Sequence, residues 1–282
     1  MNAGPQRSSA PRDDQRRSEA IEPSPRISVT WMGHSTVLVE VDGIRILTDP
    51  LLTRRLAHLR RRAPTPTVGP VDVVLVSHVH MDHLHLPSLR MTASGARLIV
   101  PEGAARLVRK IPVHSIEEVR RGAVVRLRGP TSGMAAVDVE VVHAHHLSGR
   151  GPHSRVSAPP VGYVMRAAGR AVYFAGDTDL FDGMRELGRL DVALLPIWGW
   201  GRTLGERHLN PESAATATGW LDLTTVVPIH WGTYSALRFG RGRPAWIDQP
   251  PDAFRDALGI LGLQDRLCVL QPGGSLQLDD VN

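Results

Sequence analysis

The most informative segment of this 282-residue chain is Ser77-His78-Val79-His80-Met81-Asp82-His83, which follows directly on the run VDVVLV at residues 71–76. The run is typical of a buried strand, so four metal-capable side chains lie within six positions at a strand end. A turn that leaves a strand can aim His78 and His80 at one ion and Asp82 and His83 at another. Polar loops this rich in histidine usually bind metal. The segment therefore predicts a metal site.

Three further ligand-type residues lie at or just past other predicted strands. His146 follows VDVEVVHA, Asp177 follows AVYFAG, and His230 follows TVVPI. Each of them repeats the placement of the first segment, and we expect all of them to meet it in space.

The rest of the chain predicts α/β layers. Asp42-Gly43 between two alternating runs indicates a hairpin, because both turn positions favour positive φ. Asn210 as N-cap and Pro211 at the first position predict a helix over Asn210–Leu221. Further helices are predicted over Asp252–Leu261 and after Pro101. The other predicted strands are ISVTWMG, TVLVEV, IRILTDP, RLIVP, AVVRLRG, VGYVMRA, DVALLPI and RLCVLQP.

Composition indicates one globular domain. Hydrophobic residues make up 42% and charged residues 22%, which excludes wholesale disorder and a membrane-embedded protein. Residues 1–26 are predicted to be a flexible tail, and 27–282 the folded domain. No run reaches the roughly 20 apolar residues of a spanning helix, and no secretory signal precedes Ile27, so we expect a cytoplasmic location. Cys268 is the only cysteine, which excludes an internal disulfide.

The histidine and aspartate pattern resembles the metallo-β-lactamase superfamily, whose hallmark His-x-His-x-Asp-His motif is followed by a His, an Asp and a His from successive strands. The resemblance covers the chain from about Ile27 to its end, and it implies a four-layer αββα sandwich. It also implies two metal sites that share one carboxylate. The implied ligands are His78, His80 and His146 for the first metal, Asp82, His83 and His230 for the second, and Asp177 bridging both.

Several shorter stretches are similar to a narrower branch, which includes ascorbate-6-phosphate lactonase and the N-acyl-phosphatidylethanolamine phospholipase D type enzymes. They are Gly33-His34-Ser35-Thr36, Leu47-Thr48-Asp49-Pro50, Phe174-Ala175-Gly176-Asp177-Thr178, His208-Leu209-Asn210-Pro211-Glu212, Leu147-Ser148-Gly149-Arg150 and Pro228-Ile229-His230-Trp231-Gly232. Relatives commonly show Pro-Ala-Gln-His where this chain has His143-Ala144-His145-His146, so His145 competes with His146 as ligand. Leu84-His85-Leu86-Pro87 stands where other branches have a glycine pair, which disfavours glyoxalase II and tRNA-processing activities.

The implied activity is that of a metal-dependent hydrolase. A hydroxide bridging two metals would attack a phosphodiester, phospholipid or lactone bond in a small anionic molecule or lipid. Asp82 and Asp177 would position this nucleophile, and His208 would contact the scissile group or protonate the leaving oxygen. The alternative for His208 is a structural histidine beside the helix. Zinc suits the histidine-rich set best, while manganese and iron are also compatible.

Other residues are candidates for support. His34 is either a partner that orients the metal ligands or a buried hydrogen-bonded histidine, and Asp49 either orients a ligand or begins a turn. The segment Leu52–Arg62 has leucines at helical spacing among five arginines, and it is read as a solvated helix or as a basic lid over an anionic substrate. Four aromatic residues could wall a pocket or belong to the core: Trp198, Trp200, Trp231 and Tyr234.

Two other functions remain as alternatives. The arginine content favours a nuclease, but the chain has no room for the inserted domain of the bulkier nucleases, so nucleic acid is disfavoured as a partner. A metal-dependent sensing or binding protein is the non-enzymatic alternative. Di-iron relatives carry a glutamate where His80 stands, which argues against oxygen chemistry. Peripheral membrane contact is compatible with a lipid substrate, and the oligomeric state is left open.

Overall fold

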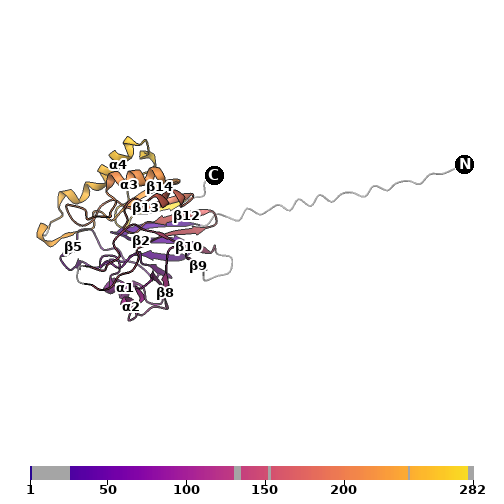
Figure 1. Cartoon of the computed structure of the whole chain (residues 1–282), viewed down its shortest axis with the longest axis horizontal. Helices are drawn as coiled ribbons and strands as arrows, with labels where there is room; N and C mark the ends of the chain where they lie inside the picture. The colour runs from indigo at the N-terminus through magenta and orange to yellow at the C-terminus, as the bar shows by residue number, and fades with distance from the viewer. Residues whose placement is uncertain (2–25, 130–134, 152–153, 241, 279–282) are drawn as a thin grey trace.

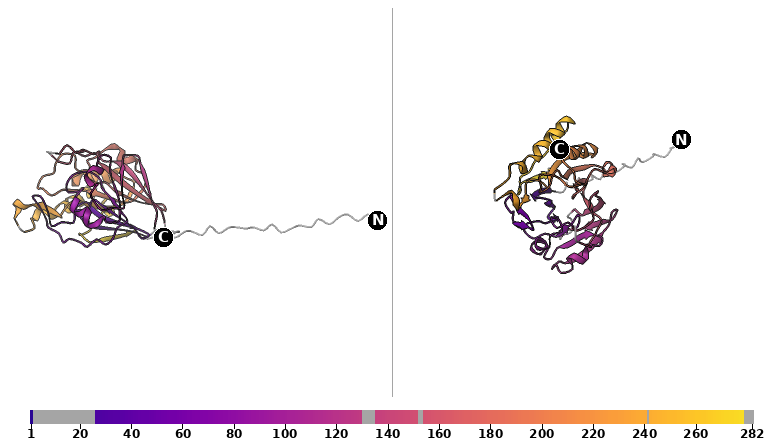
Figure 2. Two further views of the ribbon diagram at one scale, coloured as in Figure 1. Left: turned by 90° about the horizontal axis from the view of Figure 1, so that it is seen from below. Right: turned by 60° about the vertical axis from the view of Figure 1, so that its left-hand side comes forward.

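The computed structural model describes residues 1, 26–129, 135–151, 154–240 and 242–278. Two β-sheets pack face to face, with helices on their outer sides (Figure 1). The helices of the first half of the chain, in purple, and the long helices of its last part, in orange and yellow, lie on opposite sides of the molecule (Figure 2). Residues 2–25 of the predicted tail lie outside the described residues. Within the described part, no helix has the length and apolar character needed to cross a membrane.

The first sheet has seven strands in the order β16-β1-β2-β3-β6-β7-β8. The pairs β16–β1, β1–β2 and β2–β3 are antiparallel, and the pairs β3–β6, β6–β7 and β7–β8 are parallel. The predicted hairpin joins β2 to β3, and Asp42 and Gly43 both have positive φ, at 47° and 88°. The bounds are β1 Ile27–Gly33, β2 Thr36–Val41, β3 Ile44–Thr48, β6 Val73–Leu75, β7 Arg97–Pro101, β8 Ser115–Val119 and β16 Ser275–Leu278.

The second sheet has six strands in the order β14-β13-β12-β11-β10-β9. Here β14, β13 and β12 run parallel, and β12, β11, β10 and β9 are antiparallel. The prediction of a strand over RLCVLQP is wrong, because Leu267 forms only an isolated bridge to Val226. The bounds are β9 Val124–Leu127, β10 Val137–His143, β11 Val161–Ala167, β12 Arg170–Phe174, β13 Leu190–Pro196 and β14 Leu223–Ile229.

Helices complete the predicted αββα sandwich. One apolar cluster holds the facing sides of the two sheets and the buried residues of α3 and α4, while a second joins the outer side of the seven-stranded sheet to α1 and α2. Successive residues of β3 point to opposite faces of the sheet, so Ile46 belongs to the first cluster and Leu47 to the second. The helices are α1 Leu86–Thr92, α2 Ala105–Val108, α3 Pro211–Trp220 and α4 Pro250–Ile260, with 3₁₀ turns η1 Asp182–Glu186, η2 Leu237–Phe239, η3 Ala245–Asp248 and η4 Gln264–Arg266.

The expectation of a helix over Leu52–Arg62 is wrong. This segment forms the hairpin β4 (Arg55–Leu56) and β5 (Leu59–Arg61), which pairs with β15 (Tyr234–Ala236) in a third, small sheet. Leu56 and Leu59 are three residues apart, but they are also directly opposite each other across the hairpin. Both leucines therefore lie on one face of the hairpin, and their spacing imitates that of a helix.

Helix α3 begins with the predicted cap. The Asn210 side chain accepts a hydrogen bond from Ser213 N at 2.8 Å, and Ser213 Oγ accepts one from Asn210 N, also at 2.8 Å. We expect Asn210→Ala to lower the free energy of unfolding by about 1 kcal/mol, because it leaves a backbone N–H without its acceptor. Chemical denaturation would measure this loss, and Asn210→Asp, which keeps the acceptor, should retain most of the stability. Equal stability of the alanine and aspartate variants would contradict the role of the cap.

Candidate metal centre

The candidate site residues all follow the carboxyl ends of strands at one edge of the sandwich. His34 follows β1, Asp49 follows β3, and the segment His78–His83 follows β6. In the second sheet, His146 follows β10, Asp177 follows β12 and His230 follows β14. His34, Asp49 and His230 have positive φ, at 55°, 32° and 63°. Such backbone is costly for residues other than glycine and gathers at functional sites.

The first group of side chains consists of His78, His80 and His146. His78 Nε2 lies 3.0 Å from His80 Nδ1, and His146 Nε2 lies 3.1 Å from the same atom. These three rings offer ligand atoms that lie within 4.8 Å of one another. His146 is therefore the member of its histidine run that joins the group. His145 instead forms a backbone bridge with Asp179, and its ring stacks on His143.

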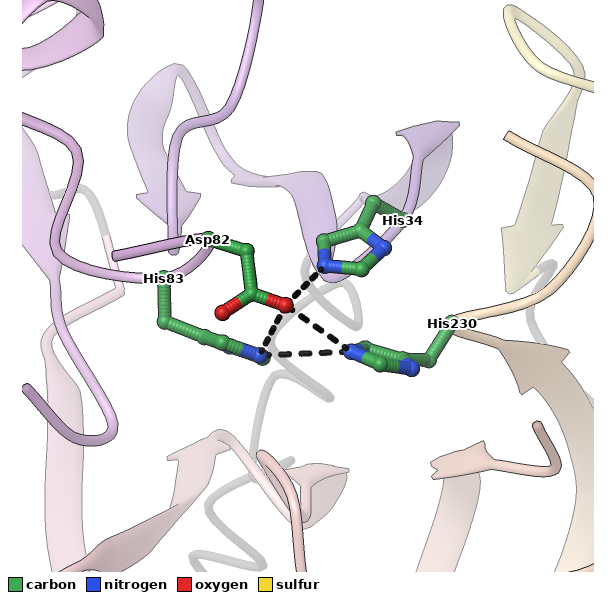
Figure 3. Close-up of side chains that lie close together, drawn as sticks. All are labelled: His34, Asp82, His83 and His230. Atoms are coloured by element: carbon green, nitrogen blue, oxygen red, sulfur yellow. Dashed lines mark hydrogen bonds and ion pairs between the residues drawn. The ribbon is translucent and has the colours of Figure 1, made fainter. Parts of the chain in front are cut away.

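The second group consists of Asp82, His83, His230 and His34, which converge as Figure 3 shows. Asp82 Oδ2 lies 3.1 Å from His34 Nε2 and 3.8 Å from His83 Nε2. His230 Nε2 lies 3.2 Å from His83 Nε2. His34 was a candidate either for orienting the metal ligands or for a buried hydrogen-bonded histidine, and its Nε2 lies among the side chains of this group. The backbones of His34 and His230 are also joined, because His230 N donates to His34 O.

Asp177 lies between the two groups. Its Oδ2 is 3.1 Å from His83 Nε2, and its Oδ1 is 3.3 Å from His230 Nε2. It also shares a potential ligand set with His146 and His208. The preceding Gly176 has a φ of 62°, and a Cβ there would lie 2.6 Å from the Cβ of Ser77. Glycine is therefore required for the Asp177 loop to approach the His78–His83 segment so closely.

In four of these histidines, the ring nitrogen that points away from the centre is hydrogen-bonded to an oxygen atom. His78 Nδ1 is 2.9 Å from Ser77 Oγ, and His83 Nδ1 is 2.7 Å from Asp49 Oδ2. The Nδ1 atoms of His146 and His230 lie 2.8 Å and 2.7 Å from the backbone oxygens of Arg207 and Trp198. A ring that donates from Nδ1 has its lone pair on Nε2. The four Nε2 atoms therefore face the centre, where each can act as a metal ligand when its ring is neutral.

Asp49 is a fully buried carboxylate at the back of this centre. Its Oδ1 accepts from Ser77 N at 2.7 Å, and its Oδ2 accepts from Ser77 Oγ at 2.5 Å as well as from His83. These contacts tie the start of the ligand segment to the end of β3. Asp49 thus orients His83 rather than merely beginning a turn.

We expect Asp49→Asn to weaken metal binding by about 10- to 100-fold. An amide that keeps its oxygen toward Ser77 N turns its NH₂ toward two hydrogen-bond donors, Ser77 Oγ and His83 Nδ1. His83 must then change its tautomer or its orientation. Titration with a chromogenic chelator would measure the loss. Asp72→Asn is the matched control, because Asp72 accepts from Arg45 N at 2.8 Å outside the site, and it should leave the affinity unchanged.

Arg150 holds both ends of the His78–His83 segment, and this contact was not predicted from the sequence. Its guanidinium donates to Val79 O at 2.9 Å and to Leu84 O at 3.3 Å, which brackets the segment. Burial lowers the pKa of this guanidinium from its ordinary value. Only the proximity of Arg150 to the His146 stretch could have suggested this contact, because both of its acceptors are backbone atoms.

The centre contains both neutral and ionised side chains. Burial lowers the pKa of His146 to about 4 and that of His230 to about 3, and it lowers the pKa of His78 well below its usual range. Burial would also lower the pKa of His83, but Asp177 and Asp82 outweigh it and raise this pKa well above its ordinary value. Burial would raise the pKa of Asp177, yet His230 and His83 hold it well below its usual range. The centre therefore combines neutral His78, His146 and His230 with ionised carboxylates, and these carboxylates favour the protonated form of His83.

This donor set fits divalent metal ions. Nitrogens around a tetrahedral ion at about 2.0–2.1 Å lie roughly 3.3–3.4 Å apart, close to the separations of 3.0–3.2 Å between the histidine nitrogens. Asp177 Oδ1 is buried and forms no hydrogen bond with any described residue. A buried carboxylate oxygen without a donor is costly, and a cation would satisfy it.

A cavity of about 630 Å³ opens over the centre. His208 lines it, with Nε2 at 3.5 Å from Asp177 Oδ2 and its ring 4.5 Å from that of His146. Burial would lower the pKa of His208, but the hydrogen bond to Asp177, the charge of Asp177 and the backbone oxygens of Glu206 and Gly205 together outweigh burial and raise it. Among the four aromatic candidates, only Trp200 lines this cavity. Tyr234 and Trp231 are buried, and Trp231 stacks on Trp31.

Comparison with known proteins identifies relatives of this chain. A family model described as the beta-lactamase superfamily domain matches residues 44–231. A UPF0173 metal-dependent hydrolase from Methanopyrus kandleri is 32% identical over 255 residues, covering 88% of this chain and 99% of that protein. One from Nitratidesulfovibrio vulgaris is 34% identical, with coverage of 89% and 95%. The solved structure of Igni18, a metallo hydrolase from Ignicoccus hospitalis, is 27% identical with a TM-score of 0.67, covering 90% of this chain and 99% of that one.

Proposed function

Because this chain belongs to the metallo-β-lactamase-fold superfamily and is a metal-dependent hydrolase, we propose that it uses two divalent metal ions to cleave a phosphodiester, phospholipid or lactone bond. The observation that carries this proposal is the position of Asp177, whose two carboxylate oxygens face His83 and His230 and whose Oδ1 forms no hydrogen bond within the described structure. A ligand oxygen of Asp177 also lies within 4.8 Å of a ring nitrogen of His146, a member of the first group, so one carboxylate lies near both groups of side chains.

The proposed ligands divide as the geometry groups them. His78, His80 and His146 would hold the first ion, Asp82, His83 and His230 the second, and Asp177 would contact both. His34 lies close enough to the second group to act as a further ligand or to hold Asp82 in place. The histidine-rich set suits zinc, and the carboxylates are also compatible with manganese or iron.

When bound, the two ions supply an acidified water and polarise the oxygen under attack. The chain's own residues supply position and proton transfer. Asp82 and Asp177, both with pKa values held well below their usual range, remain ionised and accept hydrogen bonds from the attacking water. His208 lines the cavity with its Nε2 at 3.5 Å from Asp177 Oδ2, and it can give a proton to the leaving oxygen.

The cavity favours a small substrate with both apolar and anionic parts. Its volume lies within the usual range for small-molecule sites. Leu56, Met81, Trp200 and Leu204 give it apolar walls, and Arg238 adds a cation. Such a lining suits a small anionic molecule or a lipid better than a nucleic-acid strand, for which stacking surfaces and a basic groove are expected.

Metal analysis combined with a substrate screen tests the proposal. Elemental analysis of the purified protein should find two metal ions per chain, and chelation should abolish turnover that zinc, manganese or iron(II) then restores. The screen would contain bis(p-nitrophenyl) phosphate, a phospholipid and a lactone, with single-stranded RNA and duplex DNA as further arms. Cleavage of nucleic acid alone would favour the nuclease alternative. Full metal loading without turnover of any substrate would favour a sensing or binding protein.

A further inference from the structure

The hairpin that borders the metal cavity carries arginines on its other side. We call residues 54–62 the arginine hairpin. In its two strands, Leu56 lies opposite Leu59 and Arg55 lies opposite Arg60. The leucines pack with Leu51 and the small sheet, and they also line the metal cavity. Because side chains alternate along a strand, the two opposed arginines project from the opposite face.

This outer face borders a second cavity, of about 840 Å³. Five arginines and no acidic residue are among the described residues that line it. They are Arg54, Arg55, Arg60, Arg61 and Arg62, together with Ala63, Pro64 and Thr65. The side chains of Arg54, Arg55 and Arg60 form no hydrogen bond or ion pair with any described residue. Their donors are therefore available to a ligand.

The cationic character of this face is costly to the fold. Like charges directly opposite each other in an antiparallel pair are destabilising, and Arg55 and Arg60 are such a pair. Next to this face, Arg61 is a buried guanidinium whose hydrogen bonds go to the backbone oxygens of Leu51, Met32 and Pro64 and to the Tyr234 hydroxyl rather than to a carboxylate. Burial and then the neighbouring Arg60 lower the pKa of Arg62. A bound anion would offset this repulsion.

We propose that the outer face of the arginine hairpin is a binding site for a small molecule that carries a phosphate or pyrophosphate group. Guanidinium groups keep their charge at all physiological pH values and bind phosphate oxygens in a bidentate manner. Arg61 is held rigidly by its backbone acceptors, and Arg62 is anchored by Ser235 Oγ at 2.7 Å and Gly240 O at 2.8 Å. Arg61 and Arg62 therefore have fixed positions beside the cavity, while Arg54, Arg55 and Arg60 supply the donors that have no partner among the described residues. The site is separate from the proposed metal centre and does not depend on it.

Calorimetric titration of the full-length, metal-loaded protein with pyrophosphate tests the site. Arg55→Gln and Arg60→Gln should each weaken one binding event by about tenfold, because each removes a charged hydrogen-bond donor. Arg109→Gln is the matched control, since Arg109 is an exposed arginine at the end of α2 and its substitution removes the same charge. Thermal melting of each variant would verify that it is folded. Identical pyrophosphate affinity in all four proteins would overturn the proposal.

Two further measurements separate the alternatives. Sedimentation with phosphatidylglycerol vesicles, compared with phosphatidylcholine vesicles, distinguishes a lipid surface from a soluble phosphate. Binding to the anionic vesicles without binding of pyrophosphate would overturn the proposal in favour of a membrane surface. Hydrolysis by the same variants reports on the metal centre alone. Loss of pyrophosphate binding in the arginine variants supports the anion site even if no substrate is hydrolysed.

Discussion

Replacing Asp177 with asparagine is expected to lower turnover by about 10³-fold or more and to reduce the bound metal from two ions to about one per chain. The substitution removes the charge that faces both groups and places an NH₂ donor within 3.1–3.3 Å of a histidine nitrogen that should bind metal. An amide nitrogen cannot act as a ligand to these ions. Because the side-chain volume hardly changes, the fold should persist.

Elemental analysis and steady-state kinetics on the same preparation would measure both effects. Asp179→Asn is the matched control, because Asp179 lies two residues along the same loop and its carboxylate accepts from the backbone N of Leu180 at 2.8 Å. That variant should keep its metals and most of its activity. An Asp177→Asn protein with two ions and nearly normal turnover would show that Asp177 does not bridge the metals.

The strand pattern predicted α/β layers, and the resemblance to the superfamily implied the two packed sheets and the seven side chains that meet at one edge of them. Strand ends are visible in a sequence because a buried run such as VDVVLV is followed at once by polar side chains. His146, Asp177 and His230 each follow such a run, after β10, β12 and β14, and these three strands run in the same direction, so their carboxyl ends lie at the same edge. This regularity predicted the convergence of seven side chains, although their roles as ligands are still a proposal.

The details that the sequence left open depend on contacts with the backbone. The hairpin β4–β5 was mistaken for a helix because Leu56 and Leu59 satisfy the spacing of both structures, and only pairing with β15 decides between them. The contacts of Arg150 with Val79 O and Leu84 O have no sequence signature, since every residue carries a carbonyl. The choice between His145 and His146 likewise depends on the side to which the chain turns after β10.

The position of His34 also could not be read from its neighbours in the sequence. Its φ of 55° turns the chain after β1, so that its N donates to Thr233 Oγ1 and its O accepts from His230 N. These partners lie about 200 residues away, at separations of 199 and 196 positions. The same strained turn brings the imidazole to 3.1 Å from Asp82. Tertiary contacts, rather than local preference, therefore place the fourth member of the second group.

His208→Gln is expected to lower kcat by about 10²- to 10⁴-fold for substrates with a poor leaving group. The Nδ1 of His208 is hydrogen-bonded to the backbone O of Glu206 at 2.9 Å, so the proton on Nε2 is the one that faces the cavity. Glutamine can donate a hydrogen bond but cannot release a proton. The loss should be small for a p-nitrophenyl ester, because p-nitrophenolate leaves without being protonated.

Metal content distinguishes this role from that of a ligand. His208→Gln should retain both ions, whereas substitution of a ligand releases at least one of them. His58→Gln is the matched control, because His58 is an exposed histidine of the same cavity whose ring contacts Trp200, and it should preserve kcat for both kinds of leaving group. An equal loss for good and poor leaving groups, or a loss of metal, would exclude His208 as the proton donor. The raised pKa of His208 fits a donor, since it keeps more of the ring protonated near neutral pH than an unperturbed histidine would be.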